Sequence, residues 1–96
     1  MRIRYTPRAF ADREAIFDYI EKRSPQGAQA VMRAIDSSIR RLEHFPYSAP
    51  ATDEPEVHEL IVPRRPYKVY YRIVDEEVWI VHIRHAARRP WIGEGE

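Results

Sequence analysis

Two short segments, each pairing a hydroxyl residue with proline, constrain the fold of this chain most strongly. Thr6-Pro7 and Ser24-Pro25 both indicate a helix start, because the hydroxyl can accept a hydrogen bond at the cap and proline is preset for the first helical position. The first pair predicts a helix from about Pro7 to Arg23, so only a residue or so separates it from the next helix. Such a short connection predicts an antiparallel helix hairpin.

Both predicted helices carry an apolar side that can pack on a core. In the second helix the apolar residues recur three and four positions apart, at Ala28, Val31, Met32, Ile35, Ile39 and Leu42. In the first helix the apolar arc comprises Ala9, Phe10, Ile16, Phe17 and Ile20. Arg13 lies inside this arc, where its methylenes can cover apolar surface with the guanidinium in water, or where it can contact an acidic residue of a partner. Both interpretations stay open.

The remaining segments predict a small sheet. Alternating polar and apolar residues predict a short strand at Arg2 to Tyr5, and β-branched and aromatic residues predict strands at 57–62, 67–74 and 77–85. Short turns, PRRP and Asp75-Glu76, join the last three into an antiparallel meander. The predicted fold class is therefore α+β: a short N-terminal strand, an antiparallel helix hairpin, then a three-stranded antiparallel meander (βααβββ), with the helices packed on one face of the sheet.

Alternation along the strands sorts their side chains into two faces. The more apolar face, expected beneath the helices, holds Leu60, Val62, Val69, Tyr71, Ile73, Trp79, Val81 and Ile83. The opposite face holds Glu59, Ile61, Lys68, Tyr70, Arg72, Ile80, His82 and Arg84. Basic and aromatic side chains thus share one surface, which indicates either a binding surface or an ordinary solvated face.

Composition limits the classes of function. The 96 residues, 44 % hydrophobic and 32 % charged, are typical of one folded domain, which we assign to residues 1–91, with residues 92–96 expected to fray. The absence of cysteine excludes disulfides and thiolate metal sites, and no apolar run is long enough for a signal peptide or a membrane span. A net charge of +1 argues against a protein that binds nucleic acid over its whole surface. We expect a cytoplasmic protein with no membrane partner and no direct sequence-specific DNA binding.

Catalytic motifs are few. His82 and His85 lie three positions apart on a strand and point to opposite faces, so we predict no metal site, and nothing in the sequence predicts another cofactor. Neither a covalent nucleophile motif nor a phosphate-cradling loop is present. What remains is a set of side chains that can move protons or stabilise phosphate charge, without a diagnostic spacing. Within that set, His85 is expected to end the last strand and to form a local hydrogen bond.

Three segments, in this order, resemble the RelE/ParE superfamily of small bacterial toxins from type II toxin–antitoxin modules. They are RIRYTPRAFADREAIFDYI, RRLEHFPYSAP and ELIVPRRPYKVYYRIVDEEVWIVHIRHAARRPW, and together they cover nearly the whole chain and favour the ParE-like branch. The chain departs from the superfamily pattern at Ala49, where such loops often carry glycine, and at Arg13, where leucine is common. The resemblance implies a bacterial cytoplasmic toxin with a cognate antitoxin as partner.

The superfamily divides by target, and the resemblance bears on that division. RelE-like members cut messenger RNA on the ribosome with basic side chains on the sheet face, whereas ParE-like members inhibit DNA gyrase. Lys68 stands where the ribonucleases usually have a catalytic arginine, but Glu59 and Ile61 stand where they have two lysines. An acid and an aliphatic side chain cannot stabilise phosphate charge.

We therefore favour a ParE-like inhibitor of DNA gyrase, with no catalytic residue and no cofactor. The alternative is a RelE-like, ribosome-dependent mRNA endoribonuclease, and a second alternative is a non-toxic relic of the family. The catalytic set of the ribonuclease alternative would be Lys68, Arg72, Arg84 and His85.

The resemblance also implies which residues meet partners. The expected antitoxin is small, with a disordered C-terminal segment whose acidic residues meet basic side chains of the toxin. We predict its contacts at Arg13, Tyr70, Arg72, His82, Arg84 and Arg88. The two alanines after His85 offer no chemistry, so we predict that the end of the chain grips its target through Arg88, Arg89 and Trp91.

Overall fold

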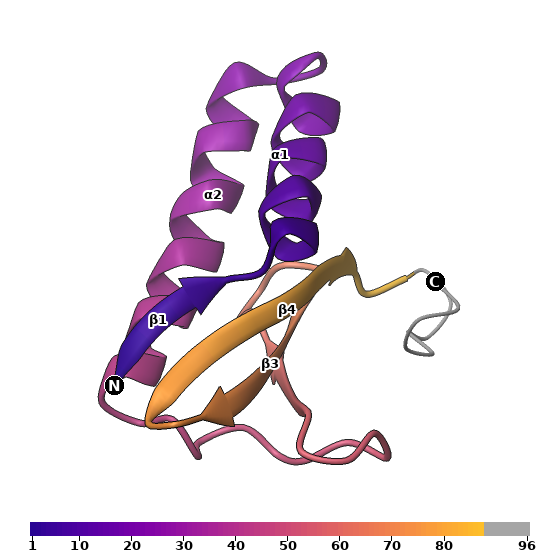
Figure 1. Ribbon diagram of the computed structural model, residues 1–96. Coiled ribbons are helices and arrows are strands. Elements are labelled where there is room, and N and C mark those ends of the chain that lie inside the picture. Colours follow the sequence, from indigo (N-terminus) through magenta and orange to yellow (C-terminus); the bar gives the residue numbers. More distant parts are fainter. Residues whose placement is uncertain (88–96) are drawn as a thin grey trace.

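The elements of the computed structural model, which describes residues 1–87, follow the predicted order (Figure 1). They are β1 (Arg2–Tyr5), α1 (Pro7–Glu21), α2 (Pro25–Arg40), the 3-10 turn η1 (Arg41–Glu43), β2 (His58–Ile61), β3 (Tyr67–Val74) and β4 (Glu77–His85). The four strands form one sheet in the order β1-β4-β3-β2, in which β1 runs parallel to β4 and the other pairs are antiparallel. The α+β class is confirmed, whereas the predicted frayed tail lies outside the described residues.

The two helix starts follow from their caps. The Thr6 hydroxyl accepts a hydrogen bond from the Ala9 N–H at 3.1 Å, and the Ser24 hydroxyl accepts one from the Gly27 N–H at 2.9 Å. Both caps satisfy a backbone donor that the first helical turn leaves without a partner. Because so little chain separates the helices, they form the predicted antiparallel hairpin, whose far end extends beyond the strands (Figure 1).

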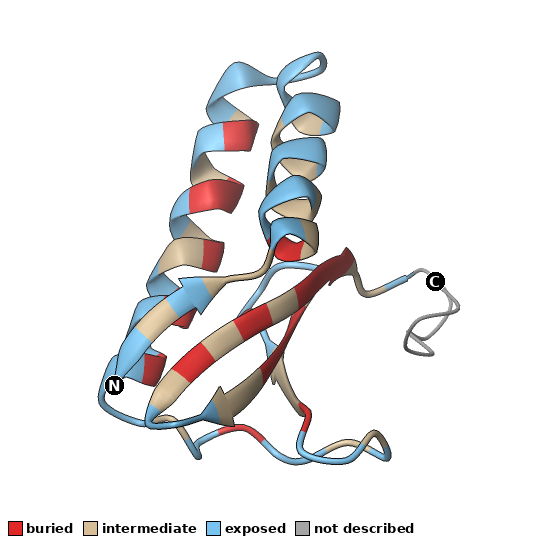
Figure 2. Ribbon diagram, viewed as in Figure 1, coloured by how far each residue is buried: buried red, intermediate tan, exposed pale blue. Residues whose placement is uncertain are grey.

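A single apolar core lies between the helix hairpin and one face of the sheet. Every apolar position predicted for α2 is buried, and Leu42 just after it is fully buried. Figure 2 shows the buried positions along the inner side of α2 and in alternation along β4. In α1 only Ala9 is fully buried, while Phe10, predicted in the same arc, is 54 % exposed. Neither helix is long and apolar enough to cross a membrane.

A β-bulge in β4 makes part of the predicted register wrong. Tyr70 pairs with His82, but the next residue, Tyr71, pairs with Ile80, so Val81 is an extra residue on β4. A bulge of this kind interrupts the alternation of side chains, so that strict alternation counted across it assigns residues to the wrong face. The predicted faces therefore hold on one side of the bulge and are reversed on the other.

The reversal exchanges Trp79 and Ile80. Ile80 is fully buried in the core, although alternation assigned it to the opposite face. Trp79 pairs with Arg72 across the strands and shares its face, which is turned away from the helices. Residues 82–84 lie beyond the bulge and keep their predicted faces, with Ile83 in the core.

Candidate functional site

The sheet face turned away from the helices, here called the outer face, brings together most of the predicted site residues. Cross-strand pairing places Ile61, Lys68 and Arg84 in one row, Glu59, Tyr70 and His82 in the next, and Arg72 with Trp79 in a third. Directly paired residues share a face of the sheet. The predicted position of Glu59 and Ile61 beside Lys68 is therefore confirmed.

Lys68 forms an ion pair with Glu59 on this face. Its Nζ lies 3.1 Å from the Glu59 carboxylate, and the two side chains are 25 % and 27 % exposed. Ile61, the direct cross-strand partner of Lys68, is 61 % exposed and adds no charge. The one ammonium group at the centre of the outer face is thus balanced by an acid from the neighbouring strand.

Arg84 is held within the fold. It is buried, and its guanidinium donates to the Tyr70 hydroxyl at 3.2 Å and to the His85 carbonyl at 3.0 Å. The same guanidinium lies 5.8 Å from the centroid of the Tyr70 ring, a cation–π distance. These contacts fix the end of β4 against β3.

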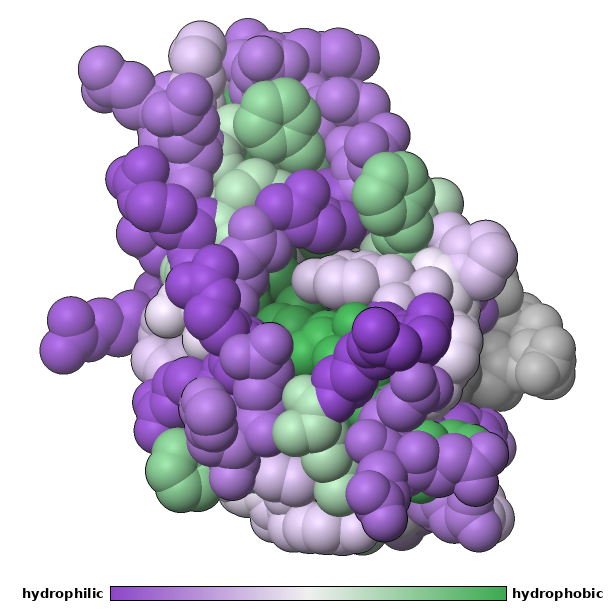
Figure 3. Space-filling model, turned by 60° about the vertical axis from the view of Figure 1, so that its left-hand side comes forward, coloured by the Kyte–Doolittle hydropathy of each residue, from purple (hydrophilic) through white to green (hydrophobic). Residues whose placement is uncertain are grey.

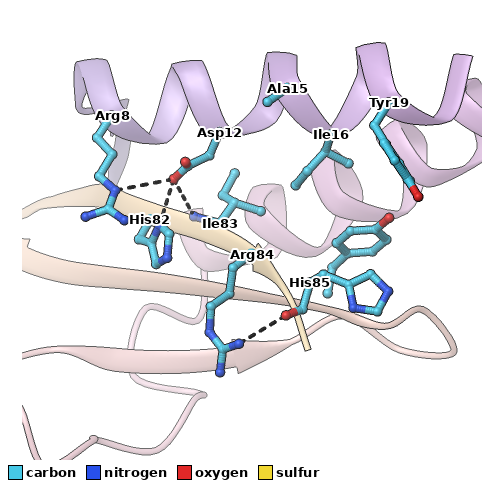
Figure 4. A pocket seen from close by; sticks show the side chains of 10 residues that line it. Arg8, Asp12, Ala15, Ile16, Tyr19, His82, Ile83, Arg84 and His85 are labelled. Atoms are coloured by element: carbon cyan, nitrogen blue, oxygen red, sulfur yellow. Dashed lines mark hydrogen bonds and ion pairs between the residues drawn. The ribbon is translucent and has the colours of Figure 1, made fainter. Parts of the chain in front are cut away.

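His82 connects the outer face to α1. Its ring stacks on Tyr70, with centroids 5.7 Å apart, and its Nδ1 lies 2.7 Å from Asp12 Oδ2 (Figure 4). The same carboxylate oxygen accepts the Ile83 backbone N–H at 3.1 Å and lies 3.9 Å from Arg8 Nε. Because an ionised carboxylate only accepts hydrogen bonds, Nδ1 of His82 carries a proton. Asp12 therefore accepts a backbone N–H at the edge of β4, beyond the residues that pair with β1.

Asp12 was not among the predicted site residues, although the sequence carries a signal for it. Asp12 is three residues after Ala9 and four before Ile16, so it lies inside the apolar side of α1. An acid at such a position needs a partner beneath the helix, because burying an unpaired charge is costly. The identity of that partner depends on the bulge at Val81, which the sequence pattern does not reveal.

An open groove of about 860 Å³ lies between α1 and the end of β4. Figure 4 shows its apolar part, which includes Ala15, Ile16 and Ile83, and the charged side chains along one border. His85 lies at one end, where its Nδ1 accepts the Ala87 N–H at 3.0 Å and its ring meets Tyr67 edge-on. The predicted local hydrogen bond of His85 is confirmed.

Arg13 is bound within the chain, an arrangement that neither interpretation from sequence included. Its guanidinium makes two hydrogen bonds to Asp36 of α2, at 3.0 and 2.6 Å, and this contact raises the pKa of Arg13. Asp36 thus pairs across the hairpin with Arg13. The pair closes one end of an interhelical groove of about 550 Å³, whose apolar members are Phe17 and Met32.

The side of the molecule that carries α2 is mostly hydrophilic. In Figure 3, apolar groups on this side are confined to a hollow and to separate protrusions among hydrophilic side chains.

Arg72, which lies on the outer face, is half-buried opposite Trp79. The predicted target-binding residues Arg88, Arg89 and Trp91 lie outside the described part of the chain. Within residues 1–87, no three His, Asp or Glu side chains are grouped to hold a metal ion.

The chain is similar to known proteins in both sequence and structure. Residues 3–90 match a family described as the ParE toxin of the type II toxin–antitoxin system parDE. Toxin RelE2 of Caulobacter vibrioides is 37 % identical over 84 residues, which cover 88 % of this chain and 93 % of that protein. Putative toxin Y4kP of Sinorhizobium fredii is 34 % identical over 85 residues, or 88 % of each protein.

Solved structures share the fold at lower sequence identity. A chain from the chromosomal ParDE toxin–antitoxin system of P. aeruginosa superposes with a TM-score of 0.79 at 24 % identity, covering 88 % of this chain and 95 % of that one. A chain of the intact E. coli RelBE toxin–antitoxin complex gives 0.69 at 13 % identity, covering 91 % and 98 %. Both of these solved chains therefore share this arrangement of helices and strands.

Proposed function

The chain belongs to the ParE toxin family of type II toxin–antitoxin systems, and from this premise we propose that it inhibits DNA gyrase by direct protein contact and is neutralised by a cognate antitoxin. The observation that carries the proposal is the ion pair of Lys68 with Glu59, at 3.1 Å. A face that cleaves a phosphodiester must offer positive charge to the phosphate oxygens as their charge develops. Here the central ammonium already faces a carboxylate, so the outer face is poorly suited to that chemistry.

Two further contacts support binding over hydrolysis. The guanidinium of Arg84 is directed into the fold by its hydrogen bonds to Tyr70 and to the His85 carbonyl. The Nδ1 atom of His85 is occupied by the Ala87 N–H. A general acid or base must reach the proton that it transfers, and a phosphate-binding arginine must reach the phosphate. Both side chains have structural contacts that compete with those roles.

The proposed antitoxin surfaces are the outer face and the groove beside α1. Under the proposal, the antitoxin meets the outer face at the half-buried Arg72 and packs over the buried Tyr70, and it reaches the groove where the buried His82 and Arg84 line it. Acidic antitoxin residues would find positive charge at Arg72 on the outer face and at Arg8 on the border of the groove, and the apolar part of the groove would take apolar anchors. Arg13 would have to exchange Asp36 for an antitoxin acid. The P. aeruginosa ParDE and E. coli RelBE systems, which share this fold, support an antitoxin partner.

Gyrase contact is assigned to the end of the chain. Arg88, Arg89 and Trp91 follow the last strand in the sequence and combine two cations with a large aromatic side chain. Arginine and tryptophan are the residue types that most often dominate protein–protein binding energy. We propose that these three side chains contact gyrase, and that Arg88 also contacts the antitoxin.

A gyrase supercoiling assay with the purified protein tests the proposed function. We expect supercoiling to be inhibited, and the inhibition to be relieved when the antitoxin encoded beside the toxin gene is added. Uninhibited supercoiling, together with cleavage of messenger RNA in a translating extract, would overturn the proposal in favour of the ribonuclease.

The ribonuclease remains the second candidate because Lys68, Arg72 and Arg84 do share one face. Its test is the double substitution Arg72→Ala with His85→Ala, expressed in cells without antitoxin. The gyrase proposal expects growth arrest to persist, since neither side chain does chemistry. A loss of arrest with the protein still folded and present at wild-type level would favour the ribonuclease.

A further inference from the structure

Charge on the outer face is distributed unevenly. Around Lys68, the outer face of β2 and β3 holds the cations of Lys68 and Arg72, and the one carboxylate that these two strands contribute is that of Glu59. Asp75 and Glu77 lie beside Arg72 and Trp79 near the β3–β4 turn, where Glu77 pairs with Arg2 and Arg4 of β1. Glu59 is therefore the acid that decides how positive the surface around Lys68 is.

Without that acid, the area has the chemistry of a surface for single-stranded nucleic acid. Such surfaces combine cations that follow the phosphate backbone with aromatic side chains against which bases can stack. The outer face has Lys68 and Arg72 on one side of β3, and the half-buried Trp79 beside Arg72, with the Arg4 guanidinium 5.8 Å from its ring centroid. The helices form the core with the opposite face of the sheet (Figure 1), so they do not cover Lys68 and Arg72.

We propose that Glu59 is the specificity-determining residue of the outer face, because it neutralises Lys68 and so prevents single-stranded nucleic acid from binding there. This inference rests on the proposed function, in which the outer face serves a protein partner. Removing the negative charge of Glu59 would convert the area into a nucleic-acid-binding surface without changing the fold.

The geometry makes the effect of Glu59 direct. Glu59 is the cross-strand partner of Tyr70 and lies diagonally next to Lys68, with its carboxylate 3.1 Å from the ammonium. A phosphate that approached Lys68 would meet the carboxylate within a few ångströms, and like charges at that distance repel. About three quarters of each side chain is buried, so water screens the repulsion less than it would for two fully exposed groups.

The pair is not needed to hold the strands together. Ion pairs at protein surfaces contribute at most about 1 kcal/mol to stability. The β2–β3 pairing also has its backbone ladder and the core contacts of Leu60 and Val69. Replacement of Glu59 by its neutral isostere is therefore expected to leave the protein folded, which makes the inference testable in the intact chain.

The test measures binding of a short, fluorescein-labelled single-stranded RNA to the full-length protein by fluorescence anisotropy. The variants are Glu59→Gln and Glu59→Gln with Ile61→Lys, which adds a cation directly opposite Lys68. Glu21→Gln, at the exposed end of α1, is the matched control with the same change in net charge. Circular dichroism melts establish that every variant is folded.

We expect Glu59→Gln to bind the RNA about tenfold more tightly than the wild type and the double variant to bind more tightly still. The logarithmic salt dependence should steepen by about 0.7 for each added phosphate contact. Adding Lys68→Met to Glu59→Gln should abolish the gain, because the gain comes from the released ammonium.

Three outcomes would overturn the inference. They are equal binding by Glu59→Gln and the wild type, an equal gain in Glu21→Gln, or a gain that survives Lys68→Met. Failure of the proposed function is recognised separately, since gyrase inhibition is measured on the wild-type protein without RNA. A wild type that spares gyrase would refute the proposed function, while the comparison of RNA affinities would still decide the role of Glu59.

Discussion

The two ends of the outer face hold their charged side chains in different ways. At β2 and β3, Lys68 meets Glu59 from the adjacent strand, and both side chains stay partly exposed. At the end of β4, His82 is buried and meets Asp12, which lies 70 residues earlier in the chain. The first pair mainly sets the charge of a surface, whereas the second joins α1 to the sheet. Substitutions at the end of β4 should therefore cost stability, and substitutions at β2 should change what the surface binds.

The largest effect is expected where the bulge reverses the register. Ile80→Ala should destabilise the protein by about 3 kcal/mol, since it removes a fully buried core side chain. Trp79→Ala, the neighbouring substitution, should cost less because Trp79 lies on the outer face. Urea denaturation of both variants measures the free energies of unfolding. A larger cost for Trp79→Ala would place the bulge elsewhere and would break the comparison.

Asp12→Ala should cost about 2 kcal/mol, because it leaves the buried His82 ring and the Ile83 N–H without their acceptor. Asp12→Asn, which keeps one oxygen acceptor of similar shape, should cost less. Both values come from chemical denaturation at neutral pH. Wild-type stability in the alanine variant would show that α1 is not held to β4 through this carboxylate.

Tyr71 lies on the core face of the sheet, and its substitution tests a contact away from both ends of the outer face. Its hydroxyl donates to the Pro46 carbonyl at 2.8 Å, so Tyr71→Phe should cost about 1 kcal/mol.

Burial raises the pKa of Tyr71 and of Tyr5 above the ordinary value of 10.0, so the folded state binds more protons than the unfolded state at alkaline pH. Stability should therefore be unaffected below pH 10 and fall as the pH rises above it.

The alkaline loss can be divided between the two tyrosines by thermal melts from neutral to alkaline pH. Tyr71→Phe should show a shallower loss than the wild type, with the remaining part caused by Tyr5. An unchanged pH dependence in Tyr71→Phe would mean that the Tyr71 phenol does not contribute to it.

Glu59→Gln should have the smallest effect on stability, about 0.5 kcal/mol or less, because the ion pair is partly exposed. Its denaturation curve sharpens the comparison with Asp12→Ala, in which a carboxylate is also removed. Equal costs for the two substitutions would show that both ends of the outer face are structural.

Local rules predicted most of the fold. The caps at Thr6 and Ser24 set the helix starts, and the β-branched and aromatic run of 67–74 matches β3 at both ends. Each of these features depends on neighbours in the sequence. The register of Glu59 against β3 also followed, because strict alternation places side chains correctly in a strand without a bulge.

The rest of the site required tertiary information. The run VWIVHI in β4 is apolar on both faces at its start, so alternation gave no sign of the extra residue Val81. Arg13 could not be assigned to Asp36, nor His82 to Asp12, since each pair joins elements whose relative position the sequence leaves undetermined. Alternation placed His82 and Arg84 on the correct face but did not predict that both would be buried.

The most direct test of the account compares gyrase inhibition by the wild type with that of a variant lacking the accessible side chains of the ribonuclease alternative. The variant carries Lys68→Met, Arg72→Met and His85→Ala, and leaves the buried Arg84 in place. If the protein acts by contact through residues after β4, the wild type and the variant should inhibit gyrase supercoiling at similar concentrations. A wild type that leaves supercoiling intact, but cuts ribosome-bound messenger RNA that the variant spares, would contradict the account.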